Sequence, residues 1–193
     1  MEEVKERLRR QKLSGRKALS GKEVAGKSRK IGKLLWGLPE FKDARTIMFY
    51  VSFGREVATH ELIMKALKTR KKVVVPKIIK NSQLQACVIK NFKKDLKTGC
   101  FGILEPKHSI RRVAPEKELD LVIVPGVCFD RTKGARIGFG QGFYDRFLGK
   151  VKGRALLIGL AFEKQLVKAI PCEKQDINMD MIVTEKRVIR IKN

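Results

Sequence analysis

DLVIVP, residues 120–125, is the stretch that decides the fold class of this chain. It is an uninterrupted apolar run, of the kind that is buried on both faces of a parallel sheet. ALLIGLAF at 155–162 has the same character, and between the two lies a helical pattern, GFYDRFLGK at 142–150. A buried strand, a helix and a second buried strand in this order are typical of an α/β domain with a parallel sheet.

The rest of the chain repeats this alternation. Ser20 and Glu23 form an S-x-x-E capping box, which predicts the start of a helix, and Pro39 predicts its end. Thr59 is expected to cap a later helix. Helices are predicted at 2–19, 20–38, 59–70 and 163–170, strands at 46–51, 72–78, 84–90, 181–183 and 188–191, and a loop-rich stretch at 91–118. The sequence therefore predicts one three-layer α/β domain over residues 1–193, with a mostly parallel sheet and helices on both faces.

Composition limits the class of protein. The 193 residues are 43% hydrophobic, which is typical of a globular chain, and no run of 18 apolar residues predicts a membrane-spanning helix. The charged start MEEVKERLRRQ lacks the apolar core of a secretory signal, so the cytoplasm is the expected location. The four cysteines form no C-x-x-C pair, so we expect reduced, largely buried thiols and not a zinc site.

The chain is strongly basic, with 44 Lys and Arg against 20 Asp and Glu and a net charge of +24. Such a surface attracts polyanions, among them nucleic acids, nucleotides and polyglutamylated small molecules. The basic residues are spread along the chain, so a solvated surface is the preferred interpretation. A non-enzymatic basic module that binds nucleic acid stays as the alternative. Its support is the charge alone, because only 7% of the residues are aromatic and no paired strands interleave aromatics with Lys and Arg.

GKEVAGKS, residues 21–28, matches the Walker A pattern, in which Lys27 would contact phosphates and Ser28 would contact Mg²⁺. Its context argues against this function. A P-loop follows a buried strand, whereas the preceding GRKALS is polar, and the capping box begins a helix inside the motif. No apolar strand ending in Asp follows as a Walker B segment. We therefore predict that this match binds no nucleotide.

RIGFGQGFYDRF, residues 136–147, lies on the segment after 120–125, where an open α/β sheet binds its ligands. Its three glycines stand at alternate positions, Gly138, Gly140 and Gly142. Glycines permit positive φ and allow backbone N–H groups to approach an anion. Arg136 adds a planar cation, the following helix directs its N-terminus to the same anion, and Asp145 is a candidate Mg²⁺ ligand. The segment therefore predicts a phosphate-binding site.

The longer segment VPGVCFDRTKGARIGFGQGFYDRFL, residues 124–148, resembles the signature of the 5-formyltetrahydrofolate cyclo-ligases, also called 5,10-methenyltetrahydrofolate synthetases. Other segments agree with that family in order along the chain, namely KERLR at 5–9, YVSFGREVAT at 50–59, GILEP at 102–106 and IPCEKQDINMDMIVTE at 170–185. The resemblance thus covers nearly the entire chain. Phe139, Gln141 and Phe143 depart from the residues that are usual in the family, and Gln141 leaves the detail of phosphate contact open.

This resemblance implies an ATP- and Mg²⁺-dependent enzyme. It would convert 5-formyltetrahydrofolate, with or without a polyglutamate tail, to 5,10-methenyltetrahydrofolate, ADP and phosphate, through phosphorylation of the formyl oxygen and ring closure. A monomer is expected, with no membrane partner and no dedicated nucleic-acid partner.

The resemblance also implies roles for individual positions. The expected ATP-binding residues are Lys5, Glu6, Arg7, Leu8, Arg9, Arg136, Ile137, Gly138, Phe139, Gly140, Gln141, Gly142, Phe143 and Tyr144, with Arg136 as the catalytic residue. The expected folate-binding residues are Tyr50, Glu56, Phe139, Gly140, Gln141, Gly142 and Phe143. Asp145 and Asp176 are the expected Mg²⁺ ligands, with Asp180 as the alternative to Asp176.

Overall fold

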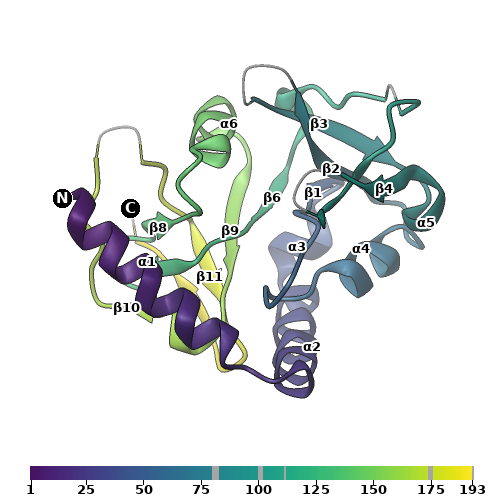
Figure 1. Cartoon of the computed structure of the whole chain (residues 1–193). Helices are drawn as coiled ribbons and strands as arrows, with labels where there is room; N and C mark the ends of the chain where they lie inside the picture. Colours follow the sequence, from purple (N-terminus) through teal and green to yellow (C-terminus); the bar gives the residue numbers. More distant parts are fainter. Residues whose placement is uncertain (80–82, 100–101, 111, 174–175, 193) are drawn as a thin grey trace.

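A computed structural model of the chain describes residues 1–79, 83–99, 102–110, 112–173 and 176–192. Its centre is a seven-stranded sheet (Figure 1). In spatial order the strands are β12 (Val188–Arg190), β11 (Met181–Val183), β9 (Leu156–Leu160), β6 (Leu121–Val124), β1 (Thr46–Met48), β2 (Lys72–Ile79) and β3 (Gln83–Ile89). The five inner strands run parallel, and β12 and β3 pair antiparallel at the two edges. The predicted mostly parallel sheet is confirmed.

Helices cover both faces of this sheet. Alternate residues of a strand point to opposite faces, so Ile47 and Leu121 join one hydrophobic layer while Met48 and Val122 join another. The first layer is completed by α2 (Gly21–Gly37), α3 (Pro39–Asp43) and α4 (His60–Ala66), and the second by α6 (Phe143–Val151). The three-layer α/β arrangement is therefore confirmed (Figure 1).

Smaller elements complete the structure. The long helix α1 (Glu2–Lys17) contacts β7 (Cys128–Asp130) and the 3₁₀ turn η4 (Glu163–Gln165), beside the main sheet (Figure 1). A three-stranded sheet contains β10 (Leu166–Val167), β7 (Cys128–Asp130) and β8 (Arg136–Ile137). The stretch predicted as loop-rich contains α5 (Phe92–Asp95), the hairpin of β4 (Leu96–Thr98) and β5 (Leu104–Pro106), and the 3₁₀ turn η3 (Glu116–Glu118).

One predicted helix is wrong. Residues 163–170 form the 3₁₀ turn η4 (Glu163–Gln165) followed by the strand β10, which pairs with β7 through Leu166 and Phe129. The buried Gln165 side chain donates to the backbone oxygens of Gly126 and Val127, at 3.0 and 2.9 Å. These long-range hydrogen bonds stabilise a turn where the local apolar pattern alone indicates a helix.

Thr59 is the N-cap residue of α4, as predicted, but its side chain forms no capping hydrogen bond. Thr59 Oγ1 donates to the backbone oxygen of Tyr50 at 2.7 Å and accepts from the backbone N–H of Ser52 at 3.1 Å. The Thr59 side chain thereby closes the loop between β1 and α4, and does not accept a hydrogen bond from the first turn of the helix. The strand that precedes this loop ends at Met48, earlier than predicted.

The Walker A match lies within α2, as its context predicts. Ser20 accepts a hydrogen bond from the Glu23 backbone N–H, and the Glu23 side chain accepts from the Ser20 backbone N–H, so the capping box is confirmed. Lys27 forms an ion pair with Glu185, and Ser28 Oγ accepts from the backbone N–H of Ala58 at 2.9 Å. A helix in place of a loop leaves no backbone cradle for a phosphate.

The thiols agree with expectation in part. Cys87 and Cys128 are buried and free, Cys172 is exposed, which is a correction, and Cys100 lies outside the described residues. In the described part of the chain, no helix combines the length and apolar character needed to cross a membrane.

Candidate functional site

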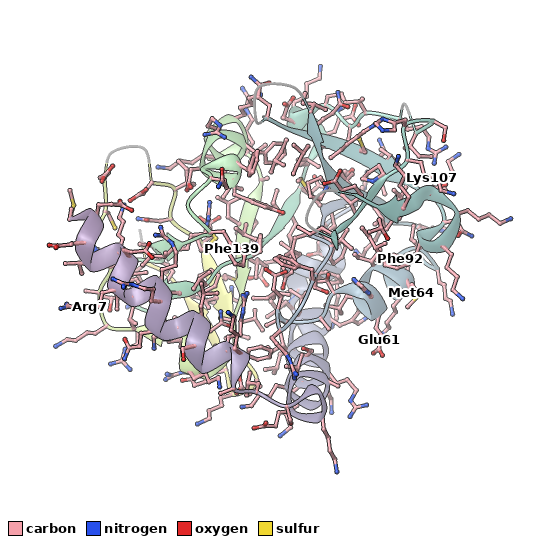
Figure 2. The ribbon with its side chains drawn as sticks, in the orientation of Figure 1. Arg7, Glu61, Met64, Phe92, Lys107 and Phe139 are labelled. Carbon is pink, nitrogen blue, oxygen red and sulfur yellow. The ribbon has the colours of Figure 1, made fainter. Side chains whose placement is uncertain are left out.

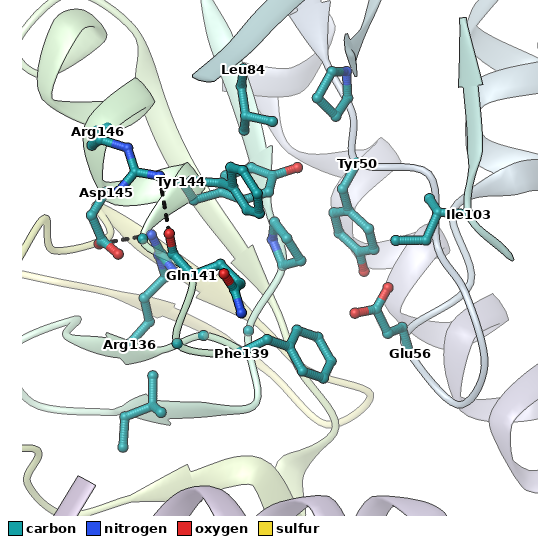
Figure 3. Close-up of a pocket in the computed structure, with 18 of the residues that line it drawn as sticks. Tyr50, Glu56, Leu84, Ile103, Arg136, Phe139, Gln141, Tyr144, Asp145 and Arg146 are labelled. Carbon is teal, nitrogen blue, oxygen red and sulfur yellow. Dashed lines mark hydrogen bonds and ion pairs between the residues drawn. The ribbon is translucent and has the colours of Figure 1, made fainter. Parts of the chain in front are cut away.

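A cavity of about 780 Å³ opens beside the carboxyl ends of β1 and β6 (Figure 3). Tyr50 and Val51, which follow β1, line it, as do Pro125 and Gly126, which follow β6. This is the edge at which open α/β sheets bind ligands, because the loops there diverge and leave a crevice. The cavity also receives residues from α1, from the β4–β5 hairpin and from the glycine-rich segment at 136–147.

The glycine-rich segment forms one wall of this cavity. Gly140 and Gly142 have φ values of +96° and +64°, a conformation that strains residues with side chains. Gly142 is the N-cap of α6, so the N-terminus of that helix borders the cavity. Gly138 lacks a positive φ, and its carbonyl accepts a hydrogen bond from Arg9 Nε at 3.0 Å. The expected turn conformations are confirmed at two of the three glycines.

Arg136, on β8, is a buried cation in the wall of the cavity, with a side chain only 3% exposed. Its Nη2 donates to Asp145 Oδ1 at 2.8 Å, and its guanidinium lies 5.7 Å from the centre of the Tyr144 ring. Its buried Nε donates to no described residue. Burial lowers the pKa of Arg136, an effect that Asp145 partly offsets. A buried cation with an unused donor at a cavity wall is suited to receive an anion.

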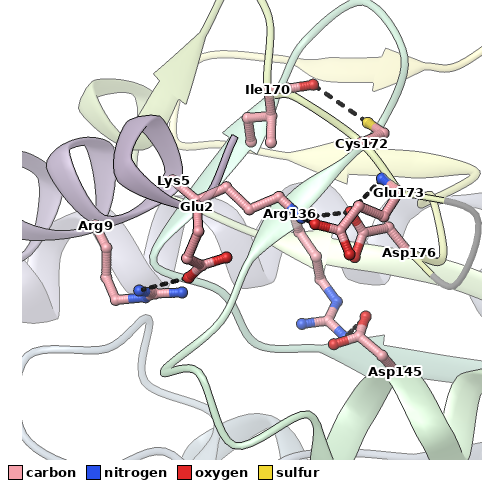
Figure 4. A network of polar contacts seen from close by, with 9 residues as sticks. All are labelled: Glu2, Lys5, Arg9, Arg136, Asp145, Ile170, Cys172, Glu173 and Asp176. Carbon is pink, nitrogen blue, oxygen red and sulfur yellow. Dashed lines mark hydrogen bonds and ion pairs between the residues drawn. The ribbon is translucent and has the colours of Figure 1, made fainter.

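Helix α1 brings two of its predicted residues to the cavity. Lys5 and Arg9, one turn apart, both line it. Arg9 pairs with Glu6 and also with Glu2 (Figure 4). Arg7 is exposed on the outer side of the helix (Figure 2), and Leu8 packs against the small apolar cluster around Ile137. Of the five residues at 5–9, the structure therefore brings only the first and last to the cavity.

The predicted metal ligands Asp145 and Asp176 both lie in the cavity wall, and each is paired with a cation. Asp176 Oδ2 accepts from Lys5 Nζ at 2.7 Å, and Asp145 pairs with Arg136 (Figure 4). The alternative Asp180 instead accepts from the backbone N–H of Leu157 at 2.7 Å and does not line the cavity. No cluster of three or more His, Cys, Asp or Glu suited to a metal occurs among the described residues.

The opposite wall carries Tyr50 and Glu56. The Tyr50 hydroxyl donates to the backbone oxygen of Val57 at 2.8 Å, which fixes the ring beside the cavity. Glu56 is only 6% exposed, and its carboxylate lies between the Tyr50 and Phe139 side chains (Figure 3). Burial raises its pKa to about 7, although Arg16 and the backbone N–H of Phe53 favour the charged form.

All three residues that depart from the family pattern, Phe139, Gln141 and Phe143, line the cavity from the glycine-rich segment. Phe139 is 46% exposed and lies 5.7 Å from Phe53, centre to centre. The backbone oxygen of Gln141 accepts from Arg146 Nη2 at 3.0 Å. The cavity therefore has a cationic wall with the glycine segment and an apolar wall with one buried carboxylate.

Sequence reasoning missed Arg16, which contacts both Glu56 and Phe139. A signal was present in the spacing. Lys5, Arg9, Lys12 and Arg16 recur at intervals of four, three and four residues, which places them on one face of α1. A basic stripe that continues past the KERLR motif places Arg16 on the same face of α1 as Lys5 and Arg9.

Comparison with known proteins agrees with this architecture. The family model described as 5-formyltetrahydrofolate cyclo-ligase matches residues 1–185. The 5-formyltetrahydrofolate cyclo-ligase of Haemophilus influenzae is 34% identical over 149 residues, covering 76% of this chain and 79% of that protein.

Two solved structures are similar over nearly the whole chain. The NMR structure of Aquifex aeolicus 5,10-methenyltetrahydrofolate synthetase is 34% identical with a TM-score of 0.87, covering 98% of this chain and 94% of that one. The Mycoplasma pneumoniae 5,10-methenyltetrahydrofolate synthetase is 25% identical with a TM-score of 0.75, covering 94% and 98%. The fold, the placement of the glycine-rich segment and the match to residues 1–185 together show that this chain belongs to the 5-formyltetrahydrofolate cyclo-ligase family of enzymes.

Proposed function

We propose that the protein converts 5-formyltetrahydrofolate to 5,10-methenyltetrahydrofolate at the expense of ATP, with Mg²⁺, and releases ADP and phosphate. One observation carries this proposal beyond family membership. A single cavity holds a buried arginine with an unused donor on one wall and a buried, sparsely bonded carboxylate on the other. The first suits a phosphate, and the second suits the N–H donors of a pterin. The non-enzymatic alternative is not retained, because the family is one of enzymes.

The proposed chemistry follows from the weakness of a formamide as an electrophile. Its oxygen attacks the γ-phosphorus of ATP, and the bond from that phosphorus to ADP breaks. The resulting iminium phosphate is then attacked at carbon by the neighbouring secondary amine of the folate. This attack closes the ring, and loss of the amine proton and departure of inorganic phosphate then give the methenyl product. The protein has to align the two substrates and stabilise moving negative charge.

The cationic wall fits the triphosphate. Lys5, Arg9 and Arg136 reach it from two elements that are distant in sequence, and the N-terminus of α6 adds its dipole. The positive φ of Gly140 and Gly142 permits close approach of the backbone. We expect Arg136 to stabilise the negative charge that develops during phosphoryl transfer, because Asp145 holds its guanidinium and the side chain is buried from water.

Asp145 and Asp176 fit Mg²⁺ that arrives with the nucleotide. Mg²⁺ is commonly held by one or two carboxylates together with substrate phosphates, and these two carboxylates lie close to Arg136 (Figure 4). The ion would neutralise phosphate charge. In its absence, Lys5 and Arg136 balance the two carboxylates.

The apolar wall fits the folate. Among the described residues, Glu56 accepts one hydrogen bond, from the backbone N–H of Phe53 to Oε2 at 3.2 Å. Its Oε1 is therefore available to accept from the amino and ring N–H groups of the pterin. Tyr50 and Phe139 offer ring faces on either side (Figure 3). A monomer in the cytoplasm, acting on folate with or without a polyglutamate tail, remains our proposal.

The direct test mixes purified protein with ATP, Mg²⁺ and 5-formyltetrahydrofolate and follows the ultraviolet absorbance of the methenyl product. We expect absorbance to rise only when all three are present, with one ADP formed per methenyl group. A protein that binds ATP and folate without forming this product would contradict the proposal.

Asp145→Asn should raise the Mg²⁺ concentration needed for half-maximal activity on the order of tenfold, because a charged oxygen ligand becomes a neutral amide. Excess Mg²⁺ should restore part of the activity, and the fold should be retained with a lowered midpoint of thermal unfolding, because the buried Arg136 loses its charged partner. Asp43→Asn, at an exposed position of α3, is the matched control. Wild-type activity at limiting Mg²⁺ would show that Asp145 is no ligand.

Lys27→Ala should leave the KM for ATP within about twofold of wild type, since the side chain pairs with Glu185 and does not line the cavity. The same change should lower the midpoint of thermal unfolding, because Glu185 is buried and loses its partner. Lys30→Ala, exposed on the same helix, should change neither. A loss of activity of about a hundredfold or more would restore the P-loop interpretation.

A further inference from the structure

Arg16, in the last turn of α1, is a buried cation with no role in the proposed binding of ATP, Mg²⁺ or folate. Its side chain is only 7% exposed, and burial lowers its pKa. Its Nη1 lies 3.8 Å from Glu56 Oε1, which is an ion pair too long for a direct hydrogen bond. Its guanidinium carbon lies 5.4 Å from the centre of the Phe139 ring, within the range of a cation–π contact.

These contacts join the two walls of the cavity. Glu56 belongs to the loop after β1, and Phe139 belongs to the glycine-rich segment, more than eighty residues later in the chain. Phe139 also contacts Phe53 of the first loop, so the arginine and two rings form one cluster. A buried charge is costly unless it is compensated, and the contacts that compensate Arg16 here are the Glu56 carboxylate and the Phe139 ring.

We infer that Arg16 is a positioning residue for the folate, holding the Glu56 carboxylate as a charged acceptor and the Phe139 ring against the same ligand. This inference rests on the proposed function, in which Glu56 accepts from the pterin. At 3.8 Å the guanidinium attracts the carboxylate without a direct hydrogen bond to Oε1. The acceptor therefore stays available to the ligand, which a closer bidentate pair would prevent.

The charge state of Glu56 depends on groups from three elements. Arg16 of α1 and the backbone N–H of Phe53 favour the carboxylate, whereas burial favours the protonated acid. Tyr50, a buried residue of the loop after β1, and Tyr144, a half-buried residue of α6, face the same carboxyl group, and desolvation raises the pKa of both so that they stay neutral. Loss of Arg16 should therefore raise the pKa of Glu56 further, and a protonated Glu56 accepts the pterin N–H groups poorly.

The test measures kcat and the KM for each substrate between pH 6 and 9 in wild type, Arg16→Gln and Arg16→Lys. For Arg16→Gln we expect the KM for 5-formyltetrahydrofolate to rise about tenfold at pH 7.5, with kcat and the KM for ATP changed less than about threefold. As the pH falls and Glu56 becomes protonated, the KM for 5-formyltetrahydrofolate should rise. In Arg16→Gln this rise should begin at a higher pH than in wild type. Arg16→Lys keeps the charge and should raise the folate KM only about threefold, with a wild-type pH profile.

Lys17→Gln removes the same charge from the next, exposed residue of α1 and should match wild type in every parameter. An unchanged folate KM in Arg16→Gln overturns the inference. So does a decrease in kcat accompanied by equal increases in both KM values, if Arg16→Lys does not reverse these changes. If Arg16→Gln does not fold, an unchanged folate KM in Arg16→Lys overturns it alone. Wild-type protein that fails to bind 5-formyltetrahydrofolate in calorimetry would instead overturn the proposed function itself.

Discussion

Arg136→Lys is expected to lower kcat at least tenfold, about 1.4 kcal/mol of transition-state stabilisation, although the charge is conserved. The guanidinium bonds to Asp145 through Nη2 and keeps Nε unused, so it can hold the carboxylate and a phosphate oxygen at once. A lysine ammonium is a single point of charge and cannot reproduce this fork. The buried position gives water no access to replace the lost donor.

Steady-state kinetics and calorimetry decide this prediction together. ATP affinity measured by calorimetry should change less than kcat, because an interaction formed mainly in the transition state affects kcat. Arg154→Lys, an exposed site outside the cavity, is the matched control. An unchanged kcat with only a raised KM for ATP would make Arg136 a binding residue and no more.

Glu56→Gln is expected to weaken folate binding on the order of a hundredfold. Hydrogen bonds to a charged acceptor contribute about 1.5–3 kcal/mol each, and the variant loses the charge at a site that is 6% exposed. The KM for ATP should remain close to that of wild type, because Glu56 lies on the wall opposite Arg136 (Figure 3). A wild-type folate KM in the variant would remove Glu56 from the site.

The same variant is expected to change the pH dependence of stability. The pKa of Glu56 is about 7 in the folded protein and 4.5 as its ordinary value, so between these values the folded state retains a proton that the unfolded chain has lost. The free energy of unfolding of wild type should therefore fall as pH rises through this window, by on the order of 2 to 3 kcal/mol between pH 5 and 8. Glu56→Gln lacks this titrating carboxyl group. Between pH 5 and 8 its free energy of unfolding should therefore rise relative to that of wild type by that amount.

Urea denaturation of ligand-free protein at pH 5 and pH 8 measures this difference, and every other titrating group cancels between the two proteins. Glu61→Gln, exposed on α4, should show no pH-dependent difference from wild type. A constant difference between Glu56→Gln and wild type at both pH values would contradict the raised pKa. The expected result would mean that the folate site is maintained at a cost in stability.

The parallel sheet and the covering helices could be predicted because their signals are local. The apolar run at 120–125 and the capping box of Ser20 and Glu23 each specify hydrogen bonding or burial within a few residues. Where local signals are short, prediction fails. Residues 163–170 have an apolar pattern that suits a helix, yet Gln165 bonds to the backbone of Gly126 and Val127, and Leu166 joins a strand.

The candidate site divides in the same way. The sequence by itself determined which segments form the site, because the glycine-rich stretch and the motifs that resemble the family are continuous runs of residues. Only the tertiary structure decided how the charges pair. Lys5 meets Asp176 across 171 positions, Arg16 meets Glu56, and the second half of the KERLR motif splits into an exposed Arg7, a packed Leu8 and a cavity-lining Arg9. The strength of a charge pair depends on its burial, and burial is set by how distant elements pack and not by their neighbours in sequence.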